Sequence, residues 1–266
     1  MEALCLEKLV PISGDIGLKG LGMEEDVLAR LRKEVNVIIS CAASINFNEP
    51  LMTLMNINYF GPLQLLDLAK ESENCSVFCH VSTAYVNSHK LHNFINMEDI
   101  VEKGDPDEIV QSILQKDPDY VQQNEKELIS PWVNPYVFCK NLVERAIRKH
   151  RGDVKTIIVR PSIVTGCYRE PMSGWTDSIS AAGVIAYPMM LGLVRNFFVG
   201  PADICICPGD VCSNAVLVAC AYADAIPNDD TTVITTCMSN LFRVPWTKFF
   251  ASGSNHLAYN PTHSGL

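Results

Sequence analysis

Two side chains in the segment NPYVFCKNLVERAIRKH, which begins at Asn134, could act together in proton transfer. Tyr136 precedes Lys140 by four residues, and residues four apart on an α-helix are offset by only about 40° and share one face. A tyrosine titrates near pKa ~10, so exchanging its proton near neutral pH requires a shift of about three units, or roughly 4 kcal/mol. A lysine ammonium at ~4 Å in a partly buried cleft supplies an interaction of that size. The spacing fits a tyrosine proton donor tuned by a lysine, and it also fits the start of an ordinary amphipathic helix.

Two further segments place small or hydroxyl-bearing residues where a strand should end. HVSTAYVN carries Ser82 and Thr83, whose hydroxyls could hold the oxygen of a carbonyl substrate. IISCAAS places Cys41, Ala42 and Ala43 in a turn that a flat ring or a ribose could approach closely. The alternatives are a strand-to-loop cap at Thr83 and plain packing of the two alanines. The order of these segments along the chain favours a shared site.

The elements that must position these residues alternate between β-branched runs and longer helical segments. Strands are expected in KLVPIS from Lys8, VNVIISC from Val35, CSVFCHVS from Cys75, KTIIVRPS from Lys155 and TTVITTC from Thr231. Helices are expected in MEEDVLARLRKE from Met23, EPLMTLMNINYFGPLQLLDLAKES from Glu49, PDEIVQSILQK from Pro106 and the segment from Asn134. Because the strand runs are apolar on both faces, the pattern predicts an α/β fold whose parallel sheet is covered on both sides.

The composition limits the function classes. The 266 residues are 48% hydrophobic and carry a formal net charge of -9, with 30 acidic and 21 basic residues, so a nucleic-acid partner is disfavoured. The eleven cysteines are an odd number, and the start of the sequence has no basic region followed by an apolar run. We therefore expect reduced thiols in the cytoplasm. The cysteines lack the spacing of a zinc site, so no metal is expected.

The chain as a whole is expected to form one incomplete domain over residues 1–250, with a loose tail over 251–266. An insertion is expected between about Ile100 and Ile129, and a lid or substrate wall between Pro171 and Gly200. The apolar stretch from Gly183 to Gly200 contains Pro188 and Arg195, which favours a core or pocket wall over a membrane span.

At these residues the sequence resembles the extended short-chain dehydrogenase/reductase superfamily, and more narrowly the fatty acyl-CoA reductases of the male-sterility type. The matching segments run in order from VPISGDI at Val10, through HVSTAYVN and NPYVFCKNLVE, to RPSIV and EPMSGW, and together span about Val10 to Phe249. HVSTAYVN and the last two segments are rather specific to the reductases, whereas the Tyr-Lys spacing is specific only to the superfamily. The resemblance implies a Rossmann-type doubly wound sheet with a small C-terminal substrate lobe.

The resemblance also implies roles for individual residues. Tyr136 would donate the proton, Lys140 would lower its pKa and bind the nicotinamide ribose, and Thr83, or else Ser82, would orient the substrate. Asn58 would support the lysine through water. The remaining cofactor contacts would be Asp15 and Ile16 at the adenine, Cys41, Ala42 and Ala43 beside the cofactor, and Pro161 and Ser162 at the nicotinamide carboxamide. Asp210 matches a later family position without a catalytic role.

The sequence departs from the family at its start. The family begins with a strand and a TGxTGxxG-type loop that cradles the pyrophosphate, and this sequence has neither. Its one glycine cluster, GLKGLG from Gly17 to Gly22, is interpreted as an ordinary loop. We therefore expect a sheet truncated at its N-terminus, with apolar faces left uncovered.

The expected function is NADPH-dependent reduction of a long-chain fatty acyl-CoA to an aldehyde or alcohol. The alternatives are a non-catalytic fragment of such a reductase and another extended dehydrogenase acting on a sterol or a nucleotide sugar. NADPH is inferred from family habit. The expected partners are the acyl-CoA and a second copy of the chain, and the expected location is the cytoplasm or the surface of the endoplasmic reticulum or peroxisome.

Overall fold

A computed structural model describes residues 8–90, 104–179, 182–190, 193, 203–225, 231–236 and 245–251. The chain divides into two compact units. Unit 1 comprises Met1–His80, Glu102–Thr156 and Asn228–Thr231, and unit 2 comprises Val81–Val101, Ile157–Pro227 and Thr232–Leu266. Each unit is described by itself below.

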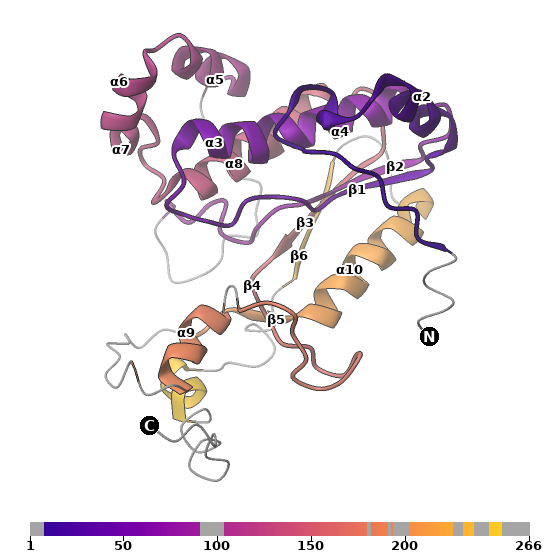
Figure 1. The fold of residues 1–266 in the computed structure, drawn as a ribbon. Helices are drawn as coiled ribbons and strands as arrows, with labels where there is room; N and C mark the ends of the chain where they lie inside the picture. The colour runs from indigo at the N-terminus through magenta and orange to yellow at the C-terminus, as the bar shows by residue number, and fades with distance from the viewer. Residues whose placement is uncertain are drawn as a thin grey trace. The chain divides into compact units, whose positions relative to one another are not determined.

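Four strands form a sheet with the order β1-β2-β3-β6 (Figure 1). They are β1 (Val37–Ser40), β2 (Val77–Val81), β3 (Thr156–Pro161) and β6 (Thr232–Thr236). β1 pairs with β2 in parallel, with Ser40 opposite His80, and β3 pairs with β6 in parallel. All four strands were expected from the sequence, and the α/β class is confirmed.

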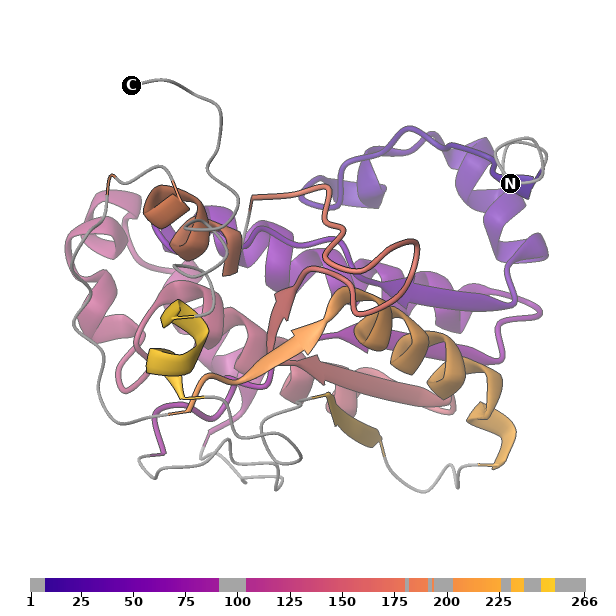
Figure 2. The same cartoon turned by 90° about the horizontal axis from the view of Figure 1, so that it is seen from below.

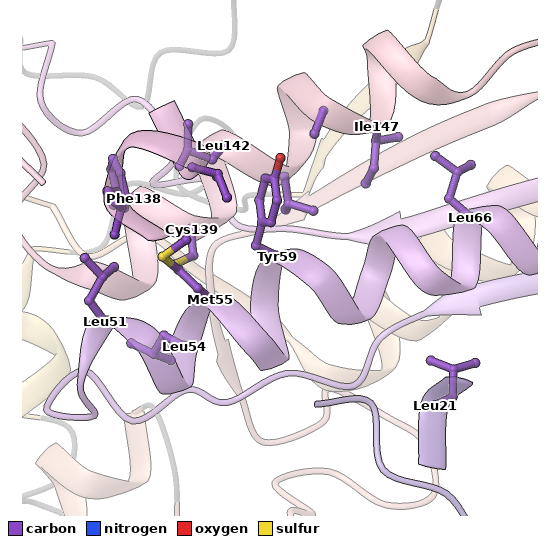
Figure 3. Close-up of a cluster of buried hydrophobic side chains, with 14 of the residues drawn as sticks. Leu21, Leu51, Leu54, Met55, Tyr59, Leu66, Phe138, Cys139, Leu142 and Ile147 are labelled. Atoms are coloured by element: carbon purple, nitrogen blue, oxygen red, sulfur yellow. The ribbon is translucent and has the colours of Figure 1, made fainter. Parts of the chain in front are cut away.

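The helical elements of unit 1 are η1 (Lys19–Gly22), α2 (Glu25–Glu34), α3 (Leu51–Met55), the π-helical turn η2 (Asn56–Phe60), α4 (Gly61–Glu71), α5 (Pro106–Leu114), α6 (Pro118–Gln123), α7 (Glu125–Leu128) and α8 (Pro135–His150). Among them α4 contacts β1, and α8 contacts α3, η2, α4 and α5. Figure 3 shows side chains of α3 and η2, such as Met55 and Tyr59, facing Phe138 and Leu142 of α8. The large buried hydrophobic cluster of unit 1 therefore holds α8 in place.

The start of α8 follows from its sequence. Asn134 is the N-cap, and its side chain accepts a hydrogen bond from the amide of Val137 at 2.9 Å. Pro135 occupies the first helical position, where its missing N–H costs nothing. The last turn carries Arg148, Lys149 and His150, cations that suit the negative end of the helix dipole. These signals fix where Tyr136 and Lys140 lie on the helix.

Unit 2 contains short elements around β3 and β6. They are β4 (Ile163–Thr165), α9 (Ala182–Met190), β5 (Ile206–Pro208), α10 (Gly209–Ala221) and the 3-10 turn η3 (Ala223–Ala225). β4 pairs with β5 in parallel, and the chain passes directly from β5 into α10 (Figure 2). Val159 and its neighbours in β3 are buried on both faces, as expected. In this unit α10 contacts β4, β5 and β6, and α9 contacts β4.

The structure corrects several expectations. The predicted strand from Lys8 is absent, and Leu9 and Val10 are exposed. Val37 and Ile39 on one face of β1 are about 40% exposed, so the sheet is not covered on both sides at this strand, in line with the expectation of uncovered apolar faces. The sequence analysis did not foresee β4, β5 and α10. The expected insertion consists of α5, α6 and α7 in its described part, while the tail 252–266 and most of 191–200 lie outside the described residues.

Candidate active site

Tyr136 and Lys140 lie in the first two turns of α8, in unit 1. Lys140 is 2% exposed, whereas Tyr136 is half-buried, and its ring packs against that of Phe47 with 5.2 Å between the ring centroids. The phenol is therefore held by the protein rather than projecting freely into solvent. One face of the helix presents both groups, as the spacing predicted.

Burial makes the charge of Lys140 costly. It lowers the pKa of the lysine to about 8, while Cys41, Glu144 and Cys139 favour the charged form and oppose the shift. The influence of Cys41 places the turn after β1 within electrostatic reach of the ammonium. A pKa close to neutral suits a group that gains and loses protons during a reaction.

The turn after β1 is fastened by Asn58, which is fully buried in η2. The amide of Ser44 donates to Asn58 Oδ1 at 2.9 Å, and Asn58 Nδ2 donates to the carbonyl of Ser44 at 2.9 Å. Cys41 and Ala42, just before this clamp, are exposed, and Ala43 is half-buried. Asn58 therefore acts on the turn directly, a role that the sequence analysis did not foresee. Functional sites often contain such π-helical turns.

A buried histidine lies in the same unit. His80 in β2 is fully buried, and its Nδ1 lies 3.2 Å from Ser40 Oγ on the paired strand. Burial, and secondarily the charge of Lys140, holds the pKa of His80 well below its ordinary value, so the imidazole is neutral at pH 7. Ser40, His80 and Lys140 thus form a buried polar group, and Asn58 is buried in the same unit. The sequence analysis missed Ser40 and His80, although a histidine inside a strand expected to be buried on both faces was a signal.

The loop that carries Asp15 and Ile16 is locked to α4. Asp15 Oδ1 accepts the amide of Gly17 at 2.8 Å, and the amide of Gly20 donates to Gln64 Oε1 at 2.7 Å. Ile16 packs directly on Gly61, where an added Cβ would lie 2.4 Å from Ile16 Cγ1. Within the cluster from Gly17 to Gly22, which was expected to be an ordinary loop, Lys19–Gly22 form the short 3-10 helix η1, and a side chain already accepts the Gly20 amide.

Unit 2 holds the hydroxyl residues at the strand ends. Thr83 Oγ1 accepts the amide of Tyr85 at 3.3 Å, and both Ser82 and Thr83 are buried. The Oγ atoms of Ser82 and Ser162 are buried without a hydrogen-bond partner in the described residues. A buried polar atom without a partner costs about 1–3 kcal/mol, so such atoms indicate a place where a ligand supplies the bond. Pro161 is also buried, at the end of β3.

The structure thus groups the predicted residues by unit. Unit 1 holds Tyr136, Lys140, Asn58, the turn from Cys41 to Ala43 and the loop with Asp15 and Ile16, and unit 2 holds Ser82, Thr83, Pro161 and Ser162. In the described part of the chain, no group of three or more His, Cys, Asp or Glu side chains could hold a metal ion. No helix there is long and apolar enough to cross a membrane.

Comparison with known proteins places the sequence among reductases. The profile of an NAD-binding family described as male sterility protein matches residues 1–216. Fatty acyl-CoA reductase 8 of Arabidopsis thaliana is 28% identical over 246 residues, covering 83% of this chain and 50% of that protein. Fatty acyl-CoA reductase 1 of Gallus gallus is 30% identical over 220 residues, covering 82% and 42%. The chain therefore spans half the length of these curated relatives, or less.

Solved structures support the fold. The terminal R domain from the myxalamid biosynthetic pathway superposes with a TM-score of 0.66 at 21% identity, covering 95% of this chain and 56% of that one. A Bordetella bronchiseptica enzyme solved with NAD and UDP superposes with a TM-score of 0.59 at 13% identity, covering 93% and 63%. The fold is therefore the Rossmann-like α/β fold of such proteins.

Proposed function

The chain belongs to the male sterility protein family, and from this premise we propose that it takes part in the NADPH-dependent reduction of a long-chain fatty acyl-CoA to an aldehyde or alcohol. The relatives named above are fatty acyl-CoA reductases, which supports this substrate class. The observation that carries the proposal is Lys140, a buried lysine with a pKa near 8 one helical turn after Tyr136.

The residues present fit the nicotinamide end of a dinucleotide. When bound, NADPH supplies the hydride. Lys140 would hold the ribose, the exposed turn at Cys41 and Ala42 allows close approach, and the partnerless Oγ of Ser162 could bond the carboxamide. Asp15 and Ile16 would contact the adenine.

The chain's own residues would handle the proton and the substrate oxygen. Tyr136 would donate its phenolic proton to the oxygen on which negative charge develops, and Lys140 would stabilise the phenolate left behind. Thr83, in unit 2, already accepts a hydrogen bond from Tyr85, so its own O–H remains able to donate to the substrate oxygen. Asn58 would keep the turn near the lysine in shape through Ser44.

The test replaces the phenolic oxygen alone. Tyr136→Phe in the full chain should lower kcat with palmitoyl-CoA and NADPH by at least about a hundredfold, because general acid catalysis contributes that much or more. The Kd for NADPH, measured by fluorescence titration, should change little. Tyr120→Phe is the matched control, since Tyr120 is an exposed tyrosine on α6 in the same unit. Equal loss of turnover and NADPH binding in Tyr136→Phe would contradict the assigned role.

The same assays separate the alternatives. A chain that turns over a sterol or a nucleotide sugar but no acyl-CoA would be another extended dehydrogenase. A chain that binds no NADPH would be a non-catalytic member of the family. Turnover of acyl-CoA that depends on Tyr136 would exclude both.

A further inference from the structure

A loop in unit 2, from Gly166 to Trp175, is closed tightly at its base. The amide of Cys167 donates to the carbonyl of Trp175 at 2.9 Å, and the amide of Gly174 donates to the carbonyl of Cys167 at 2.7 Å. A Cβ at Gly166 would lie 2.8 Å from the carbonyl oxygen of Gly174, so the two arms meet only because residue 166 is glycine. The backbone of the loop is therefore well fixed at its base.

Asp210, in the first turn of α10, fastens the outer part of this loop. Its Oδ1 accepts the amide of Tyr168 at 2.8 Å, and its Oδ2 accepts the amides of Arg169 at 2.8 Å and Glu170 at 3.2 Å. These amides, with that of Val211, hold the pKa of the Asp210 carboxyl down at about 2. Three consecutive amides on one carboxylate define the path of the chain at Tyr168–Glu170.

The fixed loop presents apolar side chains to the outside. Tyr168, Met172 and Trp175 are 60%, 58% and 42% exposed. Exposed apolar area costs free energy, and a backbone fixed in advance lowers the ordering cost of binding an apolar ligand there. Arg169 lies over the ring of Tyr168 at 5.0 Å and restricts that ring further.

The loop follows the proposed site directly along the chain. Ser162, whose partnerless Oγ lies at the end of β3, is followed by β4 and then by Gly166. Four residues span at most about 14 Å when extended, which is shorter than a long acyl chain. A thioester whose carbonyl lies at the strand ends can therefore reach the loop with its chain.

We propose that Asp210 is a positioning residue that holds the Gly166–Trp175 loop as an apolar contact for the acyl chain of the substrate. This rests on the proposed function, because it takes a long-chain acyl thioester as the substrate. The proposed contact lies along the acyl chain, away from the carbonyl carbon that reacts. Its loss should therefore weaken binding of long chains and leave the chemical step nearly intact.

The kinetic test compares two chain lengths. In Asp210→Asn, one amide acceptor is replaced by an NH2 group that repels the loop amides. We expect the KM for palmitoyl-CoA to rise about tenfold, which corresponds to about 1.4 kcal/mol of lost binding. The KM for octanoyl-CoA and both kcat values should change less than about twofold. Asp210→Glu, which keeps the carboxylate, should recover part of the palmitoyl-CoA affinity.

Asp117→Asn is the matched control. Asp117 also accepts backbone amides at a helix start, those of Asp119 and Tyr120, but in unit 1. This variant should keep the ratio of the two KM values. An unchanged ratio in Asp210→Asn, or an equal change for both chain lengths, would overturn the inference while the proposed function stands.

A binding measurement tests whether the Gly166–Trp175 loop contacts the acyl chain, even if the protein shows no turnover. The chain has three tryptophans, so the emission of Trp175 is taken as the difference between the native protein and Trp175→Phe. Palmitoyl-CoA without NADPH should change this emission far more than octanoyl-CoA, and Asp210→Asn should remove the difference. A response in an inactive chain would contradict the proposed function but support the loop. No response, or the same response in Asp210→Asn, or one that tracks only self-association, would overturn the inference.

Discussion

Lys140 on α8 and Asp210 on α10 both have pKa values below their ordinary ones, and the two shifts have opposite meanings. For the lysine, burial disfavours the charged form and brings the pKa to about 8. For the aspartate, backbone amides favour the charged form and bring the pKa to about 2. Unit 1 therefore holds a charge at a cost in stability, whereas unit 2 uses a charge to fix its backbone.

The surroundings of the two residues explain this difference. Lys140 lies in a helix packed by large hydrophobic residues such as Phe138 and Leu142, with Ser40 and His80 in the same buried polar group. Asp210 faces three amides of a loop that is open to solvent. Groups held at a cost tend to mark chemistry, while satisfied groups tend to mark positioning. The comparison therefore fits the proposal, which places proton chemistry in unit 1 and substrate placement in unit 2.

Replacing Lys140 gives the largest expected effect on this comparison. A shift from 10.5 to about 8 corresponds to about 3 kcal/mol at about 1.4 kcal/mol per unit. Since the folded pKa is the lower one, the unfolded chain binds more protons between pH 8 and 10.5, and the native protein gains stability as pH rises through that window. Lys140→Met should therefore abolish turnover yet raise the free energy of unfolding at pH 7 by up to about 3 kcal/mol.

Urea unfolding at pH 7 and pH 10 measures this gain. The difference between Lys140→Met and the native protein should shrink as pH rises from 8 towards 10.5, because the lysine is neutral in the folded state above pH 8 and loses its charge in the unfolded state only around pH 10.5. Lys116→Met, at an exposed position on the same unit, should change little at either pH. If Lys140→Met is less stable than the native protein at both pH 7 and pH 10, the attraction of Glu144 and the other neighbours for the lysine charge outweighs the cost of burying it.

His80 gives the second effect. Its pKa is well below its ordinary 6.5 because of burial and the nearby Lys140, so the unfolded chain binds more protons as pH falls below 6.5. The native protein should therefore lose stability from this residue as pH falls through 6.5. His80→Asn removes the titration, so the variant should lose less stability than the native protein between pH 8 and pH 5 in urea unfolding. An identical pH dependence in both proteins would mean that His80 takes up a proton without cost.

The four central strands and the start of α8 could be predicted because their signals are local. β-branched runs mark the strands, and Asn134 followed by Pro135 marks the helix start. The strand expected from Lys8 is absent, since strand formation depends on neighbours, and Leu9 and Val10 are exposed. β4 and β5, with three residues each, are too short to show a period.

The candidate site was predictable in its residue types but not in its contacts. The spacing of Tyr136 and Lys140 is visible in the sequence, and so are the hydroxyls at the strand end. The clamp between Asn58 and Ser44, and the one between Asp210 and the loop about 40 residues earlier, join side chains to backbone atoms across the fold. Backbone amides are present at every position except proline, so the residue types do not predict which backbone group a side chain will bind.

Replacing Ser82 should give the smallest change in stability, and it tests most directly how unit 2 differs from unit 1. The buried Oγ of Ser82 has no partner in the described residues, and neither has that of Ser162, so unit 2 also holds polar groups at a cost. Ser82→Ala removes that cost, and the free energy of unfolding without ligand should stay the same or rise by up to about 1 kcal/mol. Thr83→Ala, which loses the bond from the Tyr85 amide, should lower it by about 1 kcal/mol.

The ligand response then assigns the Ser82 hydroxyl. If it awaits a substrate or cofactor oxygen, Ser82→Ala should weaken binding of palmitoyl-CoA or NADPH by about tenfold while leaving the protein as stable as before. A gain in stability without any loss of binding would make Ser82 an unpaired packing residue. In that case Thr83 would be the hydroxyl of this strand end that orients the substrate, and the proton chemistry would remain with Tyr136 and Lys140 of unit 1.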